Sequence, residues 1–131
     1  MVDVYIDGAS AGDPGPSGAG VFINYKNGQV ENHSIPLGEM SNHEAEYEAL
    51  IHALDLCLER RLSIVSFRTD SKLIDEAIEK RYVKNKRFQP YLEKALKRTD
   101  QFDLFFMKWI PSSQNKSADA LARQAIQKNG K

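Results

Sequence analysis

The sequence predicts an α/β fold on one mixed five-stranded sheet, with the first three strands antiparallel, the rest parallel, and helices on both faces. Three strand-like segments joined by turns occupy the first forty residues, which implies an antiparallel meander. Helical periodicity then alternates with short apolar runs. Strands separated by helices pair in parallel, because a parallel crossover needs a dozen or more residues. The length of 131 residues fits one domain, so we expect a single domain over residues 1–131 whose last few residues are disordered.

The three N-terminal strands are marked by apolar alternation and by the turn residues between them. Apolar and polar residues alternate through the first strand, as in a sheet with one buried face. Five of the eight glycines then fall between Gly8 and Gly20, mixed with prolines, which is typical of a loop. An Asn-Gly pair at residues 27–28 is a hairpin signal. We therefore expect strands at residues 2–7, 19–25 and 29–37, with a glycine-rich loop at residues 8–17.

The rest of the chain has the pattern of several helices and two further strands. Ser41 followed by Glu44 is a capping-box pattern, and apolar residues then recur at helical spacing as far as Arg60. The other expected elements are a strand at residues 63–68, a helix around residues 73–78, a helix at 88–98, a strand at 102–110, a loop at 111–114 and a helix at 115–128.

Composition and charge narrow the class of protein. Hydrophobic residues make up 41% and charged residues 27%, a balance typical of a folded domain. No apolar run is long enough for a membrane helix, and acids stand near the N-terminus where a signal peptide would carry lysines. A single cysteine, Cys57, excludes an internal disulfide and an all-cysteine zinc site. We therefore expect a cytoplasmic protein without a membrane partner.

The formal net charge is zero, but the charges are segregated along the chain. Residues 1–79 carry a net charge of −9 and residues 80–98 a net charge of +7. The charge of the whole chain therefore argues neither for nor against a nucleic-acid partner, whereas the local basic segment is informative.

Two aspartates stand at the ends of predicted strands. Asp7 closes the first strand and Asp70 follows the strand at residues 63–68. Ligands of α/β sheets bind beyond the carboxyl ends of parallel strands, so neighbouring positions for these two strands would bring both carboxylates together there. Taken singly, each aspartate is equally explained as a turn or helix-capping residue.

Two further acids lie on predicted helices. Glu46 falls within the apolar arc of its helix, where a carboxylate is costly unless it is hydrogen-bonded, paired or metal-bound. Asp119 lies in the first turn of the last helix, where interaction with the helix dipole is a sufficient structural reason. Four acids at chain-distant element ends nevertheless have the pattern of a metal site. Oxygen-only ligands suit Mg²⁺ or Mn²⁺, and two such ions can flank a phosphoryl displacement.

Four segments resemble type 1 ribonuclease H in order and spacing. Residues 5–20 (YIDGASAGDPGPSGAG) resemble the opening signature of that family, and residues 41–47 (SNHEAEY) its glutamate helix. Residues 69–71 (TDS) resemble the segment of its third acid, and residues 115–122 (NKSADALA) that of its fourth. The resemblance covers nearly the whole chain. It implies a ribonuclease H-like fold and an endoribonuclease that hydrolyses the RNA strand of an RNA–DNA hybrid, with double-stranded RNA left open as a second substrate.

The resemblance also implies roles for individual residues. Asp7, Glu46, Asp70 and Asp119 would be the catalytic residues and the ligands of two Mg²⁺ or Mn²⁺ ions when substrate is bound. Reading the 2′-hydroxyl is how a protein distinguishes RNA from DNA. The candidate substrate contacts are Gly8, Ser10, Gly12, Asp13, Asn42, His43, Ser71 and Lys72. No obligate protein partner is evident.

The sequence departs from the family pattern at three points, of which the missing histidine and Asp13 favour a different kind of protein. The loop at residues 111–114 lacks the histidine that many members carry, Asp13 stands where the family has asparagine, and the separate basic protrusion is missing. The alternative is therefore a non-catalytic or weakly active nucleic-acid-binding module with the same fold. The basic segment could replace the protrusion, since basic residues interleaved with aromatics suit backbone contacts. Its candidate contacts are Lys80, Arg81, Lys84, Lys86 and Arg87, although a solvated link between two helices would look the same.

Overall fold

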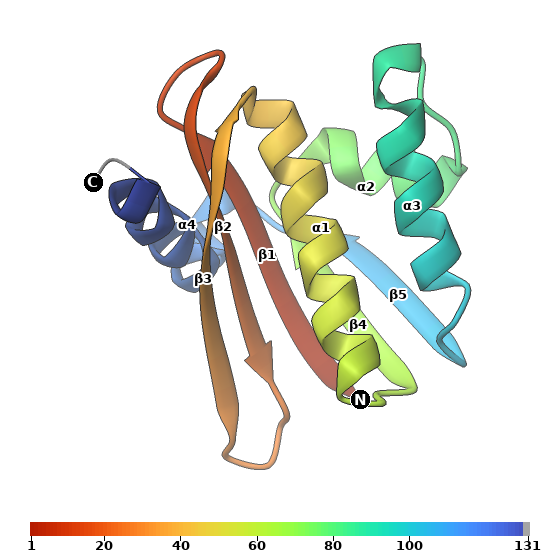
Figure 1. Ribbon diagram of the computed structural model, residues 1–131. Helices are drawn as coiled ribbons and strands as arrows, with labels where there is room; N and C mark the ends of the chain where they lie inside the picture. The colour runs from red at the N-terminus through yellow and green to blue at the C-terminus, as the bar shows by residue number, and fades with distance from the viewer. Residues whose placement is uncertain (130–131) are drawn as a thin grey trace.

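Five strands form one mixed sheet in the order β3-β2-β1-β4-β5 (Figure 1). The computed structural model describes residues 1–129. The strands are β1 (Val2–Ser10), β2 (Gly15–Asn24), β3 (Val30–Met40), β4 (Ile64–Thr69) and β5 (Leu104–Trp109). β1, β2 and β3 pair antiparallel, whereas β4 pairs parallel with both β1 and β5. The predicted fold class is confirmed, down to the division between antiparallel and parallel strands.

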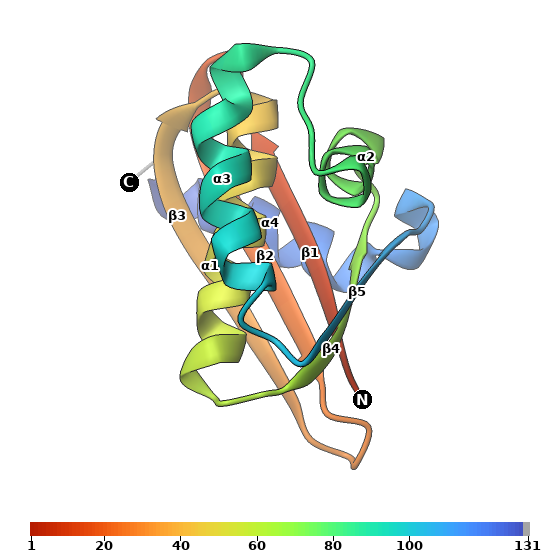
Figure 2. The same cartoon turned by 90° about the vertical axis from the view of Figure 1, so that its right-hand side faces the viewer.

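Helices cover both faces of this sheet. They are α1 (Asn42–Glu59), α2 (Lys72–Lys80), α3 (Gln89–Thr99) and α4 (Lys116–Asn129), with short 3₁₀ turns η1 (Lys86–Phe88) and η2 (Ser112–Gln114). In Figures 1 and 2, α1 and α3 lie side by side on one face and α4 lies alone on the other. The main core, which includes Phe67, Leu50 and Tyr47, lies between the sheet and α1.

The first hairpin is longer than the sequence indicated, and the expected loop at residues 8–17 is wrong. Gly8 pairs with Ala19, and the ladder continues to Ser10 opposite Ser17. Only residues 11–14 connect the two strands. Glycines resemble loop residues in sequence, but Gly8, Gly18 and Gly20 are strand positions that a helix backbone approaches closely.

The start of α1 follows the predicted capping box. The Ser41 hydroxyl accepts a hydrogen bond from the Glu44 backbone N–H, and the Glu44 carboxylate accepts one from the Ser41 N–H. The helix ends at Glu59, with Arg60 as its C-cap.

No helix within residues 1–129 combines the length and apolar character needed to cross a bilayer. The expectation of disorder in the last few residues extends to residues 130–131, which lie outside the described residues.

Candidate active site

Four carboxylates from four different elements line one open cleft of about 620 Å³. Asp7 comes from β1, Glu46 from α1, Asp70 from the residue after β4, and Asp119 from the first turn of α4. All four acids singled out in the sequence are thus brought together, although they lie up to more than a hundred residues apart in the chain.

The register of two parallel strands places Asp7 beside Asp70. The pairing of β1 with β4 ends at Ile6 opposite Thr69, so both aspartates occupy the next position along their strands. β1 itself continues to Ser10 through its pairing with β2. Asp7 therefore lies inside a strand rather than at its end, while it still stands at the carboxyl edge of the parallel part of the sheet.

Two glycines let the helices approach closely enough to place the other two acids. A Cβ atom on Gly8 would lie 2.1 Å from the carbonyl oxygen of Ala45, directly before Glu46. A Cβ atom on Gly20 would lie 2.0 Å from the carbonyl oxygen of Ala118, directly before Asp119. Both distances are prohibitive for any side chain, so glycine is required where α1 crosses β1 and where α4 crosses β2.

The Glu46 carboxylate is held from both sides. Ser71 donates a hydrogen bond to Oε2 at 2.6 Å, and Asn42 donates one to Oε1 at 3.0 Å. His43 Nδ1 lies 3.7 Å from Oε2. The cost of placing this carboxylate on the apolar side of α1 is therefore offset by hydrogen bonds from α1 itself and from the first residue before α2.

Burial and mutual repulsion raise the pKa values of the clustered acids. Burial, together with the negative charges of Asp70 and Asp119, raises the pKa of Asp7 to about 8. Burial also raises the pKa of Asp70 and that of Glu46, although the Ser71 hydrogen bond opposes the rise for Glu46. Among the lysines and arginines of the described residues, only Arg123 is paired with the cluster, and its Nε lies 3.0 Å from Asp119 Oδ2. A cluster of this kind favours a bound cation, which would let every carboxylate ionise.

The donor set fits hard divalent cations. Four carboxylates and no nitrogen or sulfur donor are the ligands that Mg²⁺ and Mn²⁺ prefer. Glu46 is engaged by Ser71 and Asn42, and Asp119 by Arg123. Within residues 1–129, no three acidic, histidine or cysteine side chains are arranged to hold a metal as they stand.

Sequence reasoning missed Asn115, which joins the site from behind. Its Nδ2 donates to the carbonyl oxygen of Ile6 at 2.9 Å, and its backbone carbonyl accepts from the N–H of Asp119 at 3.1 Å. This buried residue thereby connects the residue before Asp7 to the helix turn that carries Asp119. Its position four residues before Asp119 was visible, but its contact with Ile6 was not.

Arg123 and Gln127 on α4 also line the cleft and were missed. They stand four and eight residues after Asp119, which places them on the same side of the helix. That spacing was a usable signal.

The other predicted substrate contacts divide into two groups. Gly8, Ser10 and Asn42 line the cleft. The remaining five do not line it: Gly12, Asp13, His43, Ser71 and Lys72. Of these, His43 and Ser71 contact Glu46, and the Lys72 ammonium lies 5.2 Å from the centre of the Trp109 ring.

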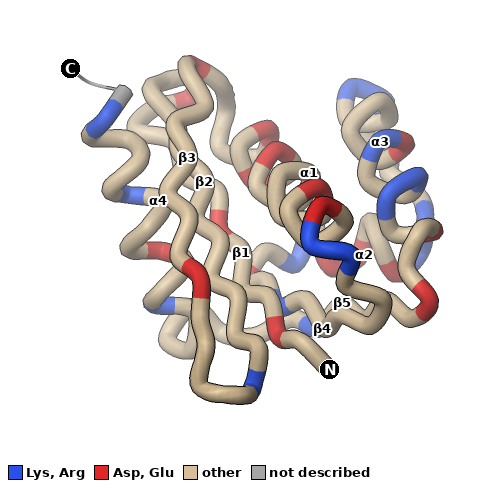
Figure 3. The backbone as a smooth tube through the Cα atoms, turned by 60° about the horizontal axis from the view of Figure 1, so that its bottom comes forward, with Lys and Arg blue, Asp and Glu red and all other residues tan. Residues whose placement is uncertain are grey.

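The basic segment, residues 80–88, lies beside the cleft rather than in it. In Figure 3, Lys and Arg recur around α3 and the segment that leads into it. Lys80 and Lys84 line a separate cavity of about 440 Å³ that His43 also borders. Arg87 pairs with Glu44, whereas Nη1 and Nη2 of Arg81 both donate to the carboxylate of Asp100.

Comparison with known proteins agrees with this geometry. The family model described as reverse transcriptase-like matches residues 5–125. The chain is 43% identical over 130 residues to the putative hydrolase EbsB of Enterococcus faecalis, covering 98% of this chain and 96% of that protein. It is 32% identical to ribonuclease HI of Halobacterium salinarum, covering 95% of this chain but 64% of that enzyme.

Solved structures give the same result. The structure of RNase H1 from Halobacterium salinarum superposes with a TM-score of 0.91 and 29% identity, covering 97% of this chain and 98% of that one. LC11-RNase H1 in complex with an RNA/DNA hybrid superposes with a TM-score of 0.90 and 32% identity over 100% of both chains. Fold, sequence and relatives agree, and the chain belongs to the ribonuclease H family as an enzyme of the type 1 kind.

Proposed function

We propose that this ribonuclease H cleaves the RNA strand of RNA–DNA hybrids endonucleolytically at the carboxylate cleft. The observation that carries the proposal is the convergence of Asp7, Glu46, Asp70 and Asp119 on one cleft from β1, α1, β4 and α4. The hybrid bound to LC11-RNase H1 supports the choice of substrate.

The four carboxylates would hold two divalent cations, Mg²⁺ or Mn²⁺, when substrate is bound. Such ions supply an activated water and stabilise the leaving oxygen of an in-line displacement. Ser71 and Asn42 keep the Glu46 carboxylate oriented before substrate arrives, and Asn115 fixes the backbone positions of Asp7 and Asp119. The chain itself thus contributes a preorganised acidic cluster, which spares reorganisation at the moment of reaction.

Recognition of the RNA strand is assigned to the rim of the cleft. Gly8 and Ser10 on β1 and Asn42 at the first residue of α1 line the same cleft as the four acids. Polar groups in this position could contact a ribose 2′-hydroxyl, the group that distinguishes RNA from DNA. A cytoplasmic location and the lack of an obligate protein partner stay predictions.

Cleavage of an end-labelled hybrid, with Mg²⁺ and then with Mn²⁺, tests the proposal. We expect cuts in the RNA strand alone, abolished by Asp70→Asn and unaffected by Asp100→Asn, which alters an exposed aspartate paired with Arg81. Double-stranded RNA and double-stranded DNA of the same sequence would define the range of substrates. Hybrid binding without cleavage by either ion would contradict the proposal and favour the binding module.

A further inference from the structure

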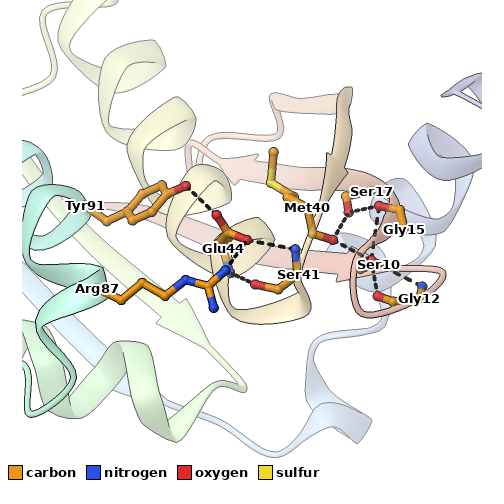
Figure 4. Close-up of polar contacts among 9 residues, drawn as sticks. All are labelled: Ser10, Gly12, Gly15, Ser17, Met40, Ser41, Glu44, Arg87 and Tyr91. Atoms are coloured by element: carbon orange, nitrogen blue, oxygen red, sulfur yellow. Dashed lines mark hydrogen bonds and ion pairs between the residues drawn. The ribbon is translucent and has the colours of Figure 1, made fainter.

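A chain of polar contacts joins the glycine-rich hairpin to the start of α1 (Figure 4). The carbonyl oxygen of Met40 lies within hydrogen-bond distance of two hydroxyl oxygens, 2.9 Å from that of Ser10 and 3.2 Å from that of Ser17. Met40 ends β3 and is followed directly by Ser41, the N-cap of α1. The hairpin, which supplies Asp7, Gly8 and Ser10 to the cleft, is thereby fixed to the end of the helix that supplies Glu46.

Through Glu44, the same helix end is fixed to the basic segment and to the start of α3, which follows that segment directly. Besides accepting from the Ser41 N–H, its carboxylate accepts from the Tyr91 hydroxyl at 3.1 Å and from Arg87 Nη2 at 3.3 Å. Figure 4 shows Tyr91 and Arg87 reaching it from the same side, from α3 and η1.

Aromatic side chains complete this contact between α1 and the basic segment. Phe88 stacks on Tyr47 with ring centres 5.4 Å apart and meets the ring of His43 edge-on at 6.1 Å. Tyr91 stacks on the Tyr47 ring as well, at 5.6 Å. The aromatic rings contribute buried contact area and a preferred stacking geometry, whereas Glu44 contributes the directional hydrogen bonds.

Glu44 stands in an electrostatically unfavourable place for a protein that binds a polyanion. It lies two residues before Glu46, beside the segment whose Lys and Arg residues are the candidate phosphate contacts. Removing a negative charge there should by itself strengthen binding of nucleic acid. A carboxylate in this position is explained if its contacts with Tyr91 and Arg87 contribute more to substrate binding than its charge costs.

We propose that Glu44 is a positioning residue. Through Arg87 and Tyr91 it fixes the basic segment, together with the start of α3 that follows it, at a set distance from the hairpin and the carboxylate cleft. A hybrid that contacts both the hairpin and the basic segment is then held across the cleft by two preformed surfaces. This inference rests on the proposed function, because it assigns the geometry of hybrid binding at that same site. Glu44 acts on binding and not on the chemical step, since the Glu46 carboxylate is held separately by Ser71 and Asn42.

Two conservative variants test this role. Tyr91→Phe removes one hydrogen bond without changing charge or ring stacking, and Glu44→Gln removes the charge while keeping a residue that a capping box accepts. For each we would measure kcat and KM on the hybrid, together with hybrid affinity by fluorescence anisotropy in chelator. We expect KM and Kd to rise about 3- to 10-fold in both variants, the size of losing one ordinary, partly exposed hydrogen bond. We expect kcat to stay within about 2-fold, because the carboxylate cluster is unchanged.

Asp55→Asn is the matched control. Asp55 on α1 accepts from Arg98 on α3 at 2.6 Å, so it joins the same two helices further from the cleft. We expect this variant to lower the Tm without changing KM. Equal rises in KM for Asp55→Asn and Tyr91→Phe would overturn the inference, because loosening of α3 in general would then explain both.

Tighter hybrid binding by Glu44→Gln would also overturn the inference. It would show that the main effect of Glu44 on binding is the repulsion between its charge and the nucleic acid. In either case the wild-type protein would still cleave the hybrid, and the proposed function would stand. Failure of the wild-type protein to bind or cleave the hybrid would instead overturn both proposals together.

Discussion

The carboxylate cleft and the basic segment are held in place by different means. At the cleft, the positions of the acids are set by the backbone: strand register places Asp7 beside Asp70, and Gly8 and Gly20 let α1 and α4 touch the sheet. The basic segment is joined to α1 by side chains instead, through Glu44 and the stacked aromatic rings. Substitutions at the cleft should therefore strongly reduce the rate of the chemical step. Substitutions in the basic segment should reduce hybrid affinity by small amounts.

The strongest test of this contrast is Asp7→Asn. The substitution keeps the shape of the side chain but removes one ligand and one negative charge from the centre of the cluster, so we expect kcat to fall about 10³-fold or more. Steady-state cleavage of the hybrid measures it. Hybrid affinity in chelator should be unchanged or slightly stronger, and a fall in affinity with an unchanged kcat would contradict the division between the two regions.

Gly8→Ala should disrupt the cleft by displacing the backbone of α1, without changing any of the four acids. The added methyl would lie 2.1 Å from the Ala45 carbonyl oxygen, so α1 must move away from β1. We expect a loss of about 3 kcal/mol in the free energy of unfolding, at the upper end for an overpacked site. Denaturant titration measures it.

Gly28→Asn is the control for this prediction. It lies in the turn between β2 and β3 with no atom within 4 Å of an added Cβ, so the cost of the substitution is limited to the strain of its positive φ of 93°. A Gly8→Ala protein as stable as Gly28→Asn would show that the close approach of α1 to β1 is not required.

The hairpin also shows where sequence reasoning fails. Alternation and the capping box are local signals, so the number of strands, their order along the chain and the start of α1 after Ser41 were predicted correctly. The loop at residues 8–17 was wrong because composition cannot distinguish a glycine that turns the chain from one that makes room for a helix. That distinction depends on Ala45 and Ala118, which lie far along the chain.

The site divides in the same way. Glu46 could be singled out because its own helix supplies the contrast between a charge and an apolar arc. The interaction of Asn115 with Ile6 spans more than a hundred residues, and the partners of Glu44 come more than forty residues after it. No local pattern encodes such pairings. Glu44 was explained by its capping role, and nothing in the sequence indicated a second one.

The charge of the cleft should appear as a pH dependence of stability when divalent ions are absent. The pKa of Asp7 is raised from 3.8 to about 8, so the folded protein holds a proton there that the unfolded chain has released. Stability should therefore decrease as pH rises from about 4 to about 8, by up to about 5 kcal/mol for the full pKa difference. Urea titrations in chelator at several pH values, on the wild type and on Asp7→Asn, measure it as the difference between the two curves.

Added Mg²⁺ should restore part of the stability that the wild-type protein loses at the upper end of this pH range. A ligand at 100 times its Kd adds about 2.7 kcal/mol to the free energy of unfolding. Asp7→Asn should gain less, because one carboxylate is missing. Parallel pH curves for the two proteins, with equal gains from Mg²⁺, would show that Asp7 does not carry this charge effect.

The smallest expected effects belong to the basic segment, where each cation contributes independently. Lys84 and Lys86 are exposed, and neither forms an ion pair within the described residues. In the double variant Lys84→Ala/Lys86→Ala, we expect KM to rise a few-fold with kcat unchanged, and the slope of log affinity against log salt to fall by about 1 for each phosphate that is no longer neutralised.

Arg81→Ala is the control, because its guanidinium is already engaged by Asp100 and should contribute little to the slope. If the double variant left the salt slope unchanged while Arg81→Ala reduced it, the nucleic acid would pass on the α3 side of the segment, and Glu44 would then position a surface that the substrate does not use.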